Sequence, residues 1–261
     1  MIPAQRQQKI LELLAKHEIV SIVQLTDALS VSHMTVRRDL QALERGGLVV
    51  TVSGGVRLAE FIGAEPSRKV KDSLQSDEKA RIAIAAAELV PADATVYLDA
   101  GTTCLAIARE IAQRDDITVL TNDFAVEAYL SENSNCELYH TGGKVLRENE
   151  SCVGDAAARF ISSLNIGVGF ISASSWDMRY ISTPTEEKVP VKKAVVAASL
   201  KKVLVSDSTK YGKVGFFKAV AIKDIDIIVT DGNLDEHSRK AISDTGTRVI
   251  ITGDHVEPNC P

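Results

Sequence analysis

The stretch from Tyr97 to Ile111, YLDAGTTCLAIAREI, joins an apolar run to a helical pattern through a short polar turn. Gly101 permits a sharp turn, and the hydroxyls of Thr102 and Thr103 can cap the following helix. The first N–H groups of a helix lack intrahelical partners and its dipole is positive there, so a phosphate can bind. Asp99 can accept hydrogen bonds from sugar hydroxyls. We predict a site for a phosphorylated sugar here, although the same residues would also make a simple capped turn.

Similar polar turns follow other apolar runs. They contain Thr121 and Asn122, then Gly142, Gly143 and Lys144, and later Lys210 in SDSTKYG. In an open parallel sheet, ligands bind beyond the carboxyl ends of the strands. If these strands are neighbours, the turns line one crevice with Asp99, and Lys210 is a candidate partner of the phosphate.

Alternating patterns in the chain beyond residue 76 must position these turns. We predict strands at Thr95–Leu98, Ile117–Thr121, Cys136–His140, Val168–Ser172, Val203–Ser206, Ile225–Thr230 and Arg248–Ile251, with helices between most of them. Such alternation is typical of an α/β domain with a mainly parallel sheet covered on both faces.

A second candidate site lies in SVSHMTVRRDLQALERGGLV, near the N-terminus. Two short capped helices joined by a tight turn, the later one starting with small polar residues and two arginines, are typical of a helix-turn-helix that enters the major groove of DNA. One arginine can bind guanine and the other a phosphate. We expect Asp39 to orient an arginine. The candidate DNA contacts on this helix are Ser32, His33, Thr35, Arg37 and Arg38.

After Gly46 and Gly47, the stretch LVVTVSGGVRL alternates apolar and polar residues around a Ser-Gly-Gly turn, which predicts a two-stranded ribbon. Arg57 is the charge nearest that turn and a further candidate DNA contact. We predict a winged helix-turn-helix over residues 1–58, an irregular polar linker over 59–76, an effector-binding and oligomerisation domain over 77–252, and a tail over 253–261.

These motifs resemble those of the DeoR-type bacterial transcriptional regulators. VSHMTVRRDL matches the family's V-S-x-x-T-[IV]-R-R-D-L helix, although Ser53 stands where the family usually has His before two glycines. The family's D-x-G-T-T, T-N, G-G and D-S-[ST]-K motifs match Asp99–Thr103, Thr121–Asn122, Gly142–Gly143 and Asp207–Lys210. The resemblance implies a winged helix-turn-helix, an effector domain that resembles ribose-5-phosphate isomerase in fold, and a sugar phosphate or related metabolite as effector.

The segment SASSWDMRYISTPTEEK, residues 172–188, departs from the family's glycine-rich pattern and holds the only tryptophan, Trp176. Trp176 either anchors this segment on the core or forms one wall of the effector pocket. We include it among the candidate effector-binding residues.

Composition excludes several other classes. Residues 1–58 carry seven Lys or Arg against five acidic residues, whereas the whole chain has a net charge of −5, so a basic module is attached to an acidic one. The four cysteines form no C-x-x-C pair, and the histidines show no metal-ligand spacing. We expect no metal and no cofactor. No apolar run reaches the roughly 18 residues of a membrane helix, and the N-terminus lacks the apolar core of a secretory signal, so we expect a cytoplasmic protein that does not bind membranes.

Two functions remain open. The first is a transcriptional regulator, with repression more expected than activation, that binds double-stranded operator DNA as a homodimer or homotetramer and responds to a phosphorylated sugar or sugar acid. The second is a sugar-phosphate isomerase-like enzyme fused to a DNA-binding module. Isomerisation needs a carboxylate base within hydrogen-bond reach of the substrate, and Asp99 is the only strong candidate in the recognisable motifs. We therefore favour a sensor without catalytic residues.

Overall fold

The computed structural model describes residues 1–52 and 54–253. Ser53 of the predicted ribbon turn, and residues 254–261 of the predicted tail, lie outside the described residues. In the described part, no helix is both long and apolar enough to cross a membrane.

The N-terminal head contains three helices and a hairpin, which include the two capped helices and the ribbon that the sequence predicts. The elements are α1 (Pro3–Leu14), α2 (Ile22–Leu29), α3 (His33–Arg45), β1 (Val49–Val52) and β2 (Gly55–Leu58). Ser21 and Gln24 form a capping box on α2, and the hydroxyl of Ser32 accepts a hydrogen bond from the Thr35 amide at the start of α3. One core cluster, which includes Ile10, Leu25 and Val36, holds these elements together.

The larger domain is built on a seven-stranded parallel sheet with the order β16–β15–β12–β9–β4–β5–β6. Its strands are β4 (Thr95–Leu98), β5 (Thr118–Thr121), β6 (Glu137–His140), β9 (Ile166–Ser172), β12 (Ser199–Val205), β15 (Ile227–Asp231) and β16 (Arg248–Thr252). The predicted parallel α/β architecture is therefore confirmed.

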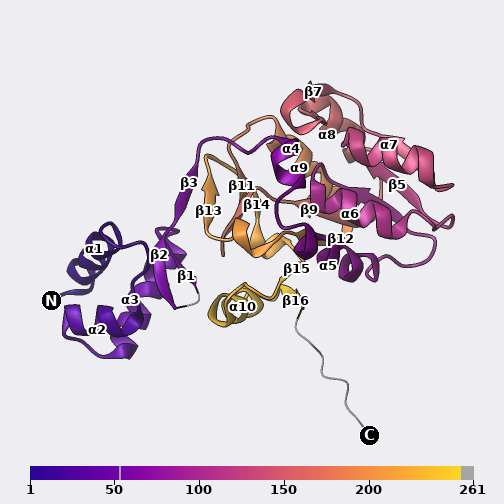
Figure 1. The fold of residues 1–261 in the computed structure, drawn as a ribbon. Coiled ribbons are helices and arrows are strands. Elements are labelled where there is room, and N and C mark those ends of the chain that lie inside the picture. Colours follow the sequence, from indigo (N-terminus) through magenta and orange to yellow (C-terminus); the bar gives the residue numbers. More distant parts are fainter. Residues whose placement is uncertain (53, 254–261) are drawn as a thin grey trace, which may run out of the picture.

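Helices cover both faces of this sheet (Figure 1). The helices α5 (Ser76–Ala87), α6 (Thr102–Ile111) and α7 (Phe124–Asn133) share one core cluster, and α8 (Asp155–Ser162), α9 (Lys188–Ala198) and α10 (Glu236–Ser243) share the other. Successive side chains of β4 enter opposite clusters: Val96 and Leu98 pack on one face and Tyr97 on the other.

Strand order reverses between β4 and β9. From β4 the chain adds β5 and β6 on one side, and from β9 it adds β12, β15 and β16 on the other. Open α/β sheets bind ligands at such a reversal, beyond the carboxyl ends of the strands. Asp99, which directly follows β4, and Ser172, which ends β9, lie at this point.

The predicted linker is more ordered than its polar composition indicates. It contains a short strand, β3 (Glu60–Ile62), and a short helix, α4 (Arg68–Asp72). β3 pairs in parallel with β13 (Lys213–Gly215), a strand of the larger domain. Figure 1 shows β3 running between the head and the larger domain. A three-residue strand has too short a pattern to be recognised before its partner is known.

The structure contains two further hairpins that the sequence patterns did not predict. β7 (Lys144–Leu146) pairs with β8 (Ser151–Val153), and the segment 172–188 contains β10 (Ser175–Trp176) and β11 (Tyr180–Thr183). β11 also pairs with β14 (Phe217–Ala221), which makes a small antiparallel sheet. Short 3-10 turns at Arg147–Asn149, Ser208–Lys210 and Ile222–Asp224 complete the described elements.

Candidate functional site

A pocket opens beyond the carboxyl ends of the central strands. Asp99, Gly101, Thr102 and Thr103 from the turn between β4 and α6 line it, together with Asn122 after β5 and Lys210 after β12. These predicted residues therefore lie around one cavity. Further polar groups, which lie outside the predicted motifs, also line it: Glu65, Lys71, Lys79, Ser172, Lys188 and Lys192.

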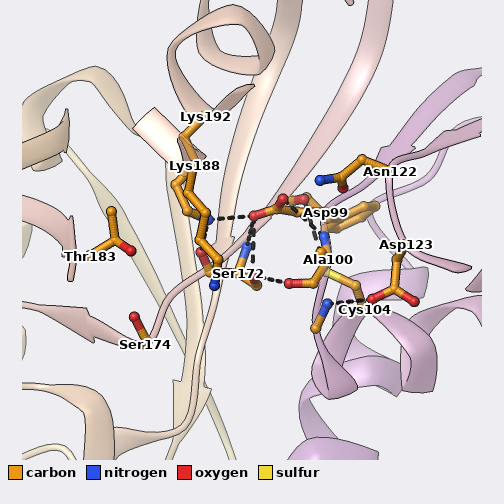
Figure 2. Close-up of polar contacts among 12 residues, drawn as sticks. Asp99, Ala100, Cys104, Asn122, Asp123, Ser172, Ser174, Thr183, Lys188 and Lys192 are labelled. Carbon is orange, nitrogen blue, oxygen red and sulfur yellow. Dashed lines mark hydrogen bonds and ion pairs between the residues drawn. The ribbon is translucent and has the colours of Figure 1, made fainter. Parts of the chain in front are cut away.

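The carboxylate of Asp99 is held by neighbours from three elements (Figure 2). Its Oδ2 lies 2.5 Å from Lys192 Nζ and accepts hydrogen bonds from the amide and the hydroxyl of Ser172, both at 3.1 Å. Its Oδ1 accepts from the Ala100 amide at 2.9 Å. Asp99 thus holds Ala100, Ser172 and Lys192 together at one side of the cavity, which we call the pocket floor, in addition to lining the cavity itself.

The turn before α6 is held by Asp123. Asp123 Oδ2 accepts a hydrogen bond from the Gly101 amide at 2.9 Å and lies 2.5 Å from Arg68 Nη1, while Oδ1 caps α7. Burial raises the pKa of Asp123, and Arg68 opposes that shift. A Cβ at position 101 would lie 3.1 Å from the Ser172 Cβ, so glycine allows β4 and β9 to end this close together.

Asn122 and Thr121 have different environments. Asn122 Oδ1 accepts from the Tyr97 hydroxyl at 2.9 Å and its amide donates to the Cys152 carbonyl, so the side chain is fixed at the pocket wall. Thr121 is fully buried and does not line the pocket. Its hydroxyl donates to the Leu98 carbonyl and accepts from the Asp123 amide. Thr121 therefore shapes the turn from behind.

The pocket is rich in lysine. Lys188 and Lys192 lie one turn apart on α9. Their i, i+4 spacing in EEKVPVKK is the sequence signal that places both lysines on one face of a helix. Lys79 of α5 donates to the backbone carbonyls of Lys71 and Leu74, and burial lowers its pKa. Lys210 Nζ lies 3.9 Å from Asp207. Cations at several walls favour an anionic ligand.

The structure corrects the predicted role of the turn after β6. Gly142, Gly143 and Lys144 do not line the pocket, and Lys144 Nζ instead forms an exposed ion pair with Glu187 at 2.8 Å. The reason is strand order, because β6 is the edge strand, two positions from β4. At about 4.8 Å per strand, its tip lies roughly 10 Å from the point of reversal.

Trp176 is a second correction. It does not line the pocket: it is fully buried, packs edge-on against Tyr211, and donates from Nε1 to the Ser206 hydroxyl at 3.1 Å. The hairpin of β10 and β11 carries this side chain inward into the core. Of the two possible roles, anchoring the segment on the core is the one that this packing supports.

The first turns of α3 present a polar, basic surface. His33, Arg37 and Arg38 are exposed, and within the described residues neither arginine forms an ion pair with a carboxylate. The Ser32 and Thr35 hydroxyls lie 3.0 Å apart. Asp39 is buried and forms an ion pair with Arg6 of α1 at 2.6 Å. The arginine that Asp39 orients is therefore Arg6, and not Arg37 or Arg38 of α3.

Arg57 lies in a different environment from that exposed surface. It is half-buried on β2 and donates to the carbonyls of Leu58 and Tyr211, at 3.3 and 3.2 Å. The Tyr211 carbonyl belongs to the larger domain, so this contact joins the ribbon to that domain and engages the guanidinium that was predicted to reach DNA.

The described residues contain no group of three or more His, Cys, Asp or Glu side chains arranged to hold a metal ion. The ionisable groups of the pocket are lysines and single carboxylates, a set suited to ionic and hydrogen-bonding contacts with an anion.

Two family models match the chain. Residues 6–61 match the DeoR-like helix-turn-helix domain and residues 74–232 match the DeoR C terminal sensor domain. The chain is 52% identical over 242 residues to the HTH-type transcriptional regulator YgbI of Escherichia coli K12. The aligned region covers 93% of this chain and 95% of the relative. It is 45% identical over 251 residues to an HTH-type transcriptional regulator of Haemophilus influenzae, covering 96% and 98%.

Among solved structures, the chain is similar to ribose 5-phosphate isomerase A of Methanocaldococcus jannaschii, with 15% identity, a TM-score of 0.38, and coverage of 52% of this chain and 54% of the isomerase. The two family models and the two relatives that are covered over nearly their whole length lead to one conclusion. The chain belongs to the DeoR family of transcriptional regulators, with an N-terminal helix-turn-helix domain and a C-terminal sensor domain.

Proposed function

We propose that this regulator represses a carbohydrate-utilisation operon in the cytoplasm and releases its operator when a phosphorylated, sugar-derived metabolite fills the pocket. One observation carries the proposal: a lysine-rich pocket at the point of strand reversal shares a chain with an exposed basic helix. A relative from Escherichia coli O157:H7 that is 29% identical over 254 residues bears the name putative aga operon transcriptional repressor, which agrees with repression.

The DNA contact is assigned to α3. Ser32, His33, Thr35, Arg37 and Arg38 cluster in its first two turns, where a recognition helix meets base edges. The exposure of both arginines supports contacts to guanine and phosphate. Arg57 is left out of this set because its guanidinium is engaged by Tyr211.

The phosphate contact is assigned to the start of α6. Gly101 and Thr102 present the first turn of that helix to the pocket, and Lys210 lines the same cavity. The positive end of the helix and a lysine together stabilise a phosphate dianion. Asn122 and Asp99 contribute the polar wall beside it.

Control of DNA binding requires that the metabolite bind two arrangements of the protein unequally. A single helix-turn-helix makes few phosphate contacts, so operator binding is proposed to use a homodimer or homotetramer that presents two heads to one face of the duplex. The metabolite would change the spacing of these heads.

An isomerase activity is not favoured. The carboxylate of Asp99, the candidate base, is paired with Lys192 and accepts two hydrogen bonds from Ser172. A base must reach the carbon acid of the substrate within hydrogen-bond distance, and these contacts already occupy the carboxylate. The relatives are named as regulators, which agrees with sensing.

The test combines a pocket variant with a matched control. The doubly substituted Thr102→Ala, Lys210→Ala protein is expected to keep operator affinity but lose release by phosphorylated sugars, measured by fluorescence anisotropy on an operator selected from random DNA. Lys144→Ala removes a lysine that lies outside the pocket and is expected to respond like the wild type. An undiminished response in the double variant would place the phosphate site elsewhere.

A further inference from the structure

The segment between the head and the sensor domain forms one wall of the pocket. Glu65, Lys71 and Leu74 all line it, and all three lie between β3 and α5. The connecting segment therefore does more than tether the head, because its side chains form part of the site.

Glu65 places its carboxylate among groups that would suit a bound anion. Its Oε2 lies 2.6 Å from Lys71 Nζ and 2.8 Å from Lys188 Nζ, and also accepts a longer hydrogen bond of 3.4 Å from Asn149. Its Oε1 accepts from the hydroxyls of Ser174 at 2.9 Å and Thr183 at 3.2 Å. Two cations and two hydroxyls around one carboxylate are the contacts that proteins use to bind carboxylate ligands.

The carboxylate stays charged although it is buried. Only 7% of the Glu65 side chain is exposed. Burial works against its charge, but the attraction of Lys188 and Lys71 outweighs burial and holds the pKa of Glu65 well below its ordinary value. Burial lowers the pKa of Lys188, and Glu65 opposes that shift. The charge of each partner therefore depends on the other being present or replaced by a similar group.

The pocket has little free space. Its free volume is about 60 Å³, whereas sites that enclose small-molecule ligands typically offer about 300–1,000 Å³. A ligand group that binds Lys71 and Lys188 must therefore take the place of the Glu65 carboxylate. Glu65 belongs to the short connecting segment between β3 and α4, whereas Lys188 and Lys192 belong to α9, which packs on the central sheet.

Figure 2 shows Lys188 with Ser174 and Thr183 on one side and Asp99 on the other. We propose that Lys188, Ser174 and Thr183, with Lys71, form a carboxylate subsite of the effector pocket, which the Glu65 carboxylate fills until the carboxylate of an effector displaces it. The effector is then a phosphorylated sugar acid: its carboxylate displaces Glu65, and its phosphate binds at the start of α6. This inference rests on the proposed phosphate site.

Only a few residues connect Glu65 to the head, so a displacement of Glu65 can change how the head docks on the sensor domain. Glu65 follows β3 by three residues, and β3 follows the ribbon strand β2 after Ala59. The Glu60 amide donates to the Gly212 carbonyl, and Arg57 donates to the Tyr211 carbonyl, so the ribbon and β3 dock on the same loop of the sensor domain. Loss of the Glu65 anchor loosens this docking and frees the heads from their operator-binding arrangement.

The experiment uses pairs of ligands that differ only in the carboxylate. The acids are 3-phosphoglycerate, 4-phosphoerythronate and 6-phosphogluconate, and their partners are glycerol 3-phosphate, erythritol 4-phosphate and sorbitol 6-phosphate. Titration calorimetry on the wild-type protein is expected to show that at least one acid binds more than about tenfold tighter than its alcohol. The same acid is expected to accelerate amide hydrogen exchange in residues 63–75, whereas the alcohol is not.

Variants separate competition from a general change of charge. Glu65→Gln is expected to tighten the preferred acid by about tenfold and the matching alcohol by less than about threefold, because only the acid competes with Glu65. Glu60→Gln removes an exposed carboxylate from the same segment, 3.8 Å from Lys213, and is expected to change neither affinity. Lys188→Gln is expected to abolish the preference for the acid.

The outcomes distinguish this inference from the proposed function. If an alcohol binds as tightly as its acid and Thr102→Ala weakens both, the phosphate site stands and the carboxylate subsite is wrong. Slower exchange of residues 63–75 with bound acid would also overturn the displacement. If no compound binds, or binding ignores Thr102→Ala and Lys210→Ala, the proposed phosphate site and this inference fail together.

Discussion

Lys192 and Asp99 form a buried ion pair at the floor of the pocket, with Nζ 2.5 Å from Oδ2 and with 7% and 5% of their side chains exposed. The lysine also donates to the Ser172 carbonyl at 2.7 Å. One pair therefore links α9 to the ends of β4 and β9, the two strands at which sheet order reverses.

Lys192→Met is expected to lower the free energy of unfolding by about 3–5 kcal/mol, because it leaves the Asp99 carboxylate buried and without its cation. Urea unfolding followed by tryptophan fluorescence measures this change. The neighbouring Lys193 is exposed, and Lys193→Met is expected to change stability by less than about 0.5 kcal/mol. Adding Asp99→Asn to Lys192→Met is expected to restore part of the loss. Equal stability of the two lysine variants would contradict a structural role for the pair.

Arg37→Ala and Arg38→Ala are each expected to weaken operator binding while the thermal stability of the head stays unchanged, because both side chains are exposed. An arginine bound to guanine, once removed, costs about 5- to 150-fold in affinity and relaxes the base preference at one position. An arginine bound to phosphate, once removed, lowers the slope of affinity against salt by about one.

Anisotropy titrations at several salt concentrations, on the selected operator and on single-base variants, distinguish these two roles. Arg45→Ala provides the control, since Arg45 lies at the other end of α3. Full operator affinity in both arginine variants would exclude α3 as the recognition helix.

Trp176→Phe is expected to destabilise the sensor domain by about 1–3 kcal/mol, because it removes a buried hydrogen bond to Ser206 and leaves space beside Tyr211. Effector affinity is expected to stay within about twofold of the wild type, since Trp176 does not line the pocket. Thermal unfolding and titration calorimetry with a phosphorylated sugar measure the two properties. A large loss of effector affinity with unchanged stability would show that Trp176 belongs to the effector pocket after all.

The stability of the protein is expected to depend on pH through Glu44, a buried carboxylate of α3. Burial raises the pKa of Glu44, and the hydrogen bond from the Thr51 amide opposes the shift. A carboxyl group with a raised pKa in the folded state binds a proton more readily when folded, so the wild type loses stability as pH rises from about 4.3 through that raised pKa.

Glu44→Gln keeps an acceptor for the Thr51 amide without the charge. The difference in unfolding free energy between variant and wild type is therefore expected to shift in favour of the variant between pH 4 and pH 7, as measured by urea unfolding at each pH. A shift in the opposite direction would show that the nearby His237, 3.7 Å from Glu44, stabilises the charged form more than burial disfavours it.

Local patterns in the sequence were sufficient for the features that depend on near neighbours in the chain. The caps of α2 and α3, the two arginines on α3, and the turn from Asp99 to Thr103 all depend on residues a few positions apart. Helix capping and strand periodicity act over this range, so the head, the parallel sheet and the start of α6 could be predicted. The alternation of strands and helices along the chain also predicted a sheet with helices on both faces.

Strand order, by contrast, is a long-range property. The turn with Gly142 and Gly143 offers threonine, glycine and lysine, as a phosphate-binding turn can, yet it leads from the edge strand β6 into β7, whereas Gly101 opens α6 beside the point of reversal. Trp176 likewise could not be assigned to core or pocket until β10 and β11 were seen to pair.

The carboxylate partners of the pocket show the same limit. Glu65 meets Lys188 across 123 positions of sequence, and Asp99 meets Lys192 across 93. The sequence by itself determined the helix-turn-helix head, the parallel fold and the turn that is proposed to bind the phosphate, since short-range capping and periodicity encode them. Only the tertiary structure decided which charges share the cavity, because that depends on how the sheet orders its strands and where the connecting segment packs against it.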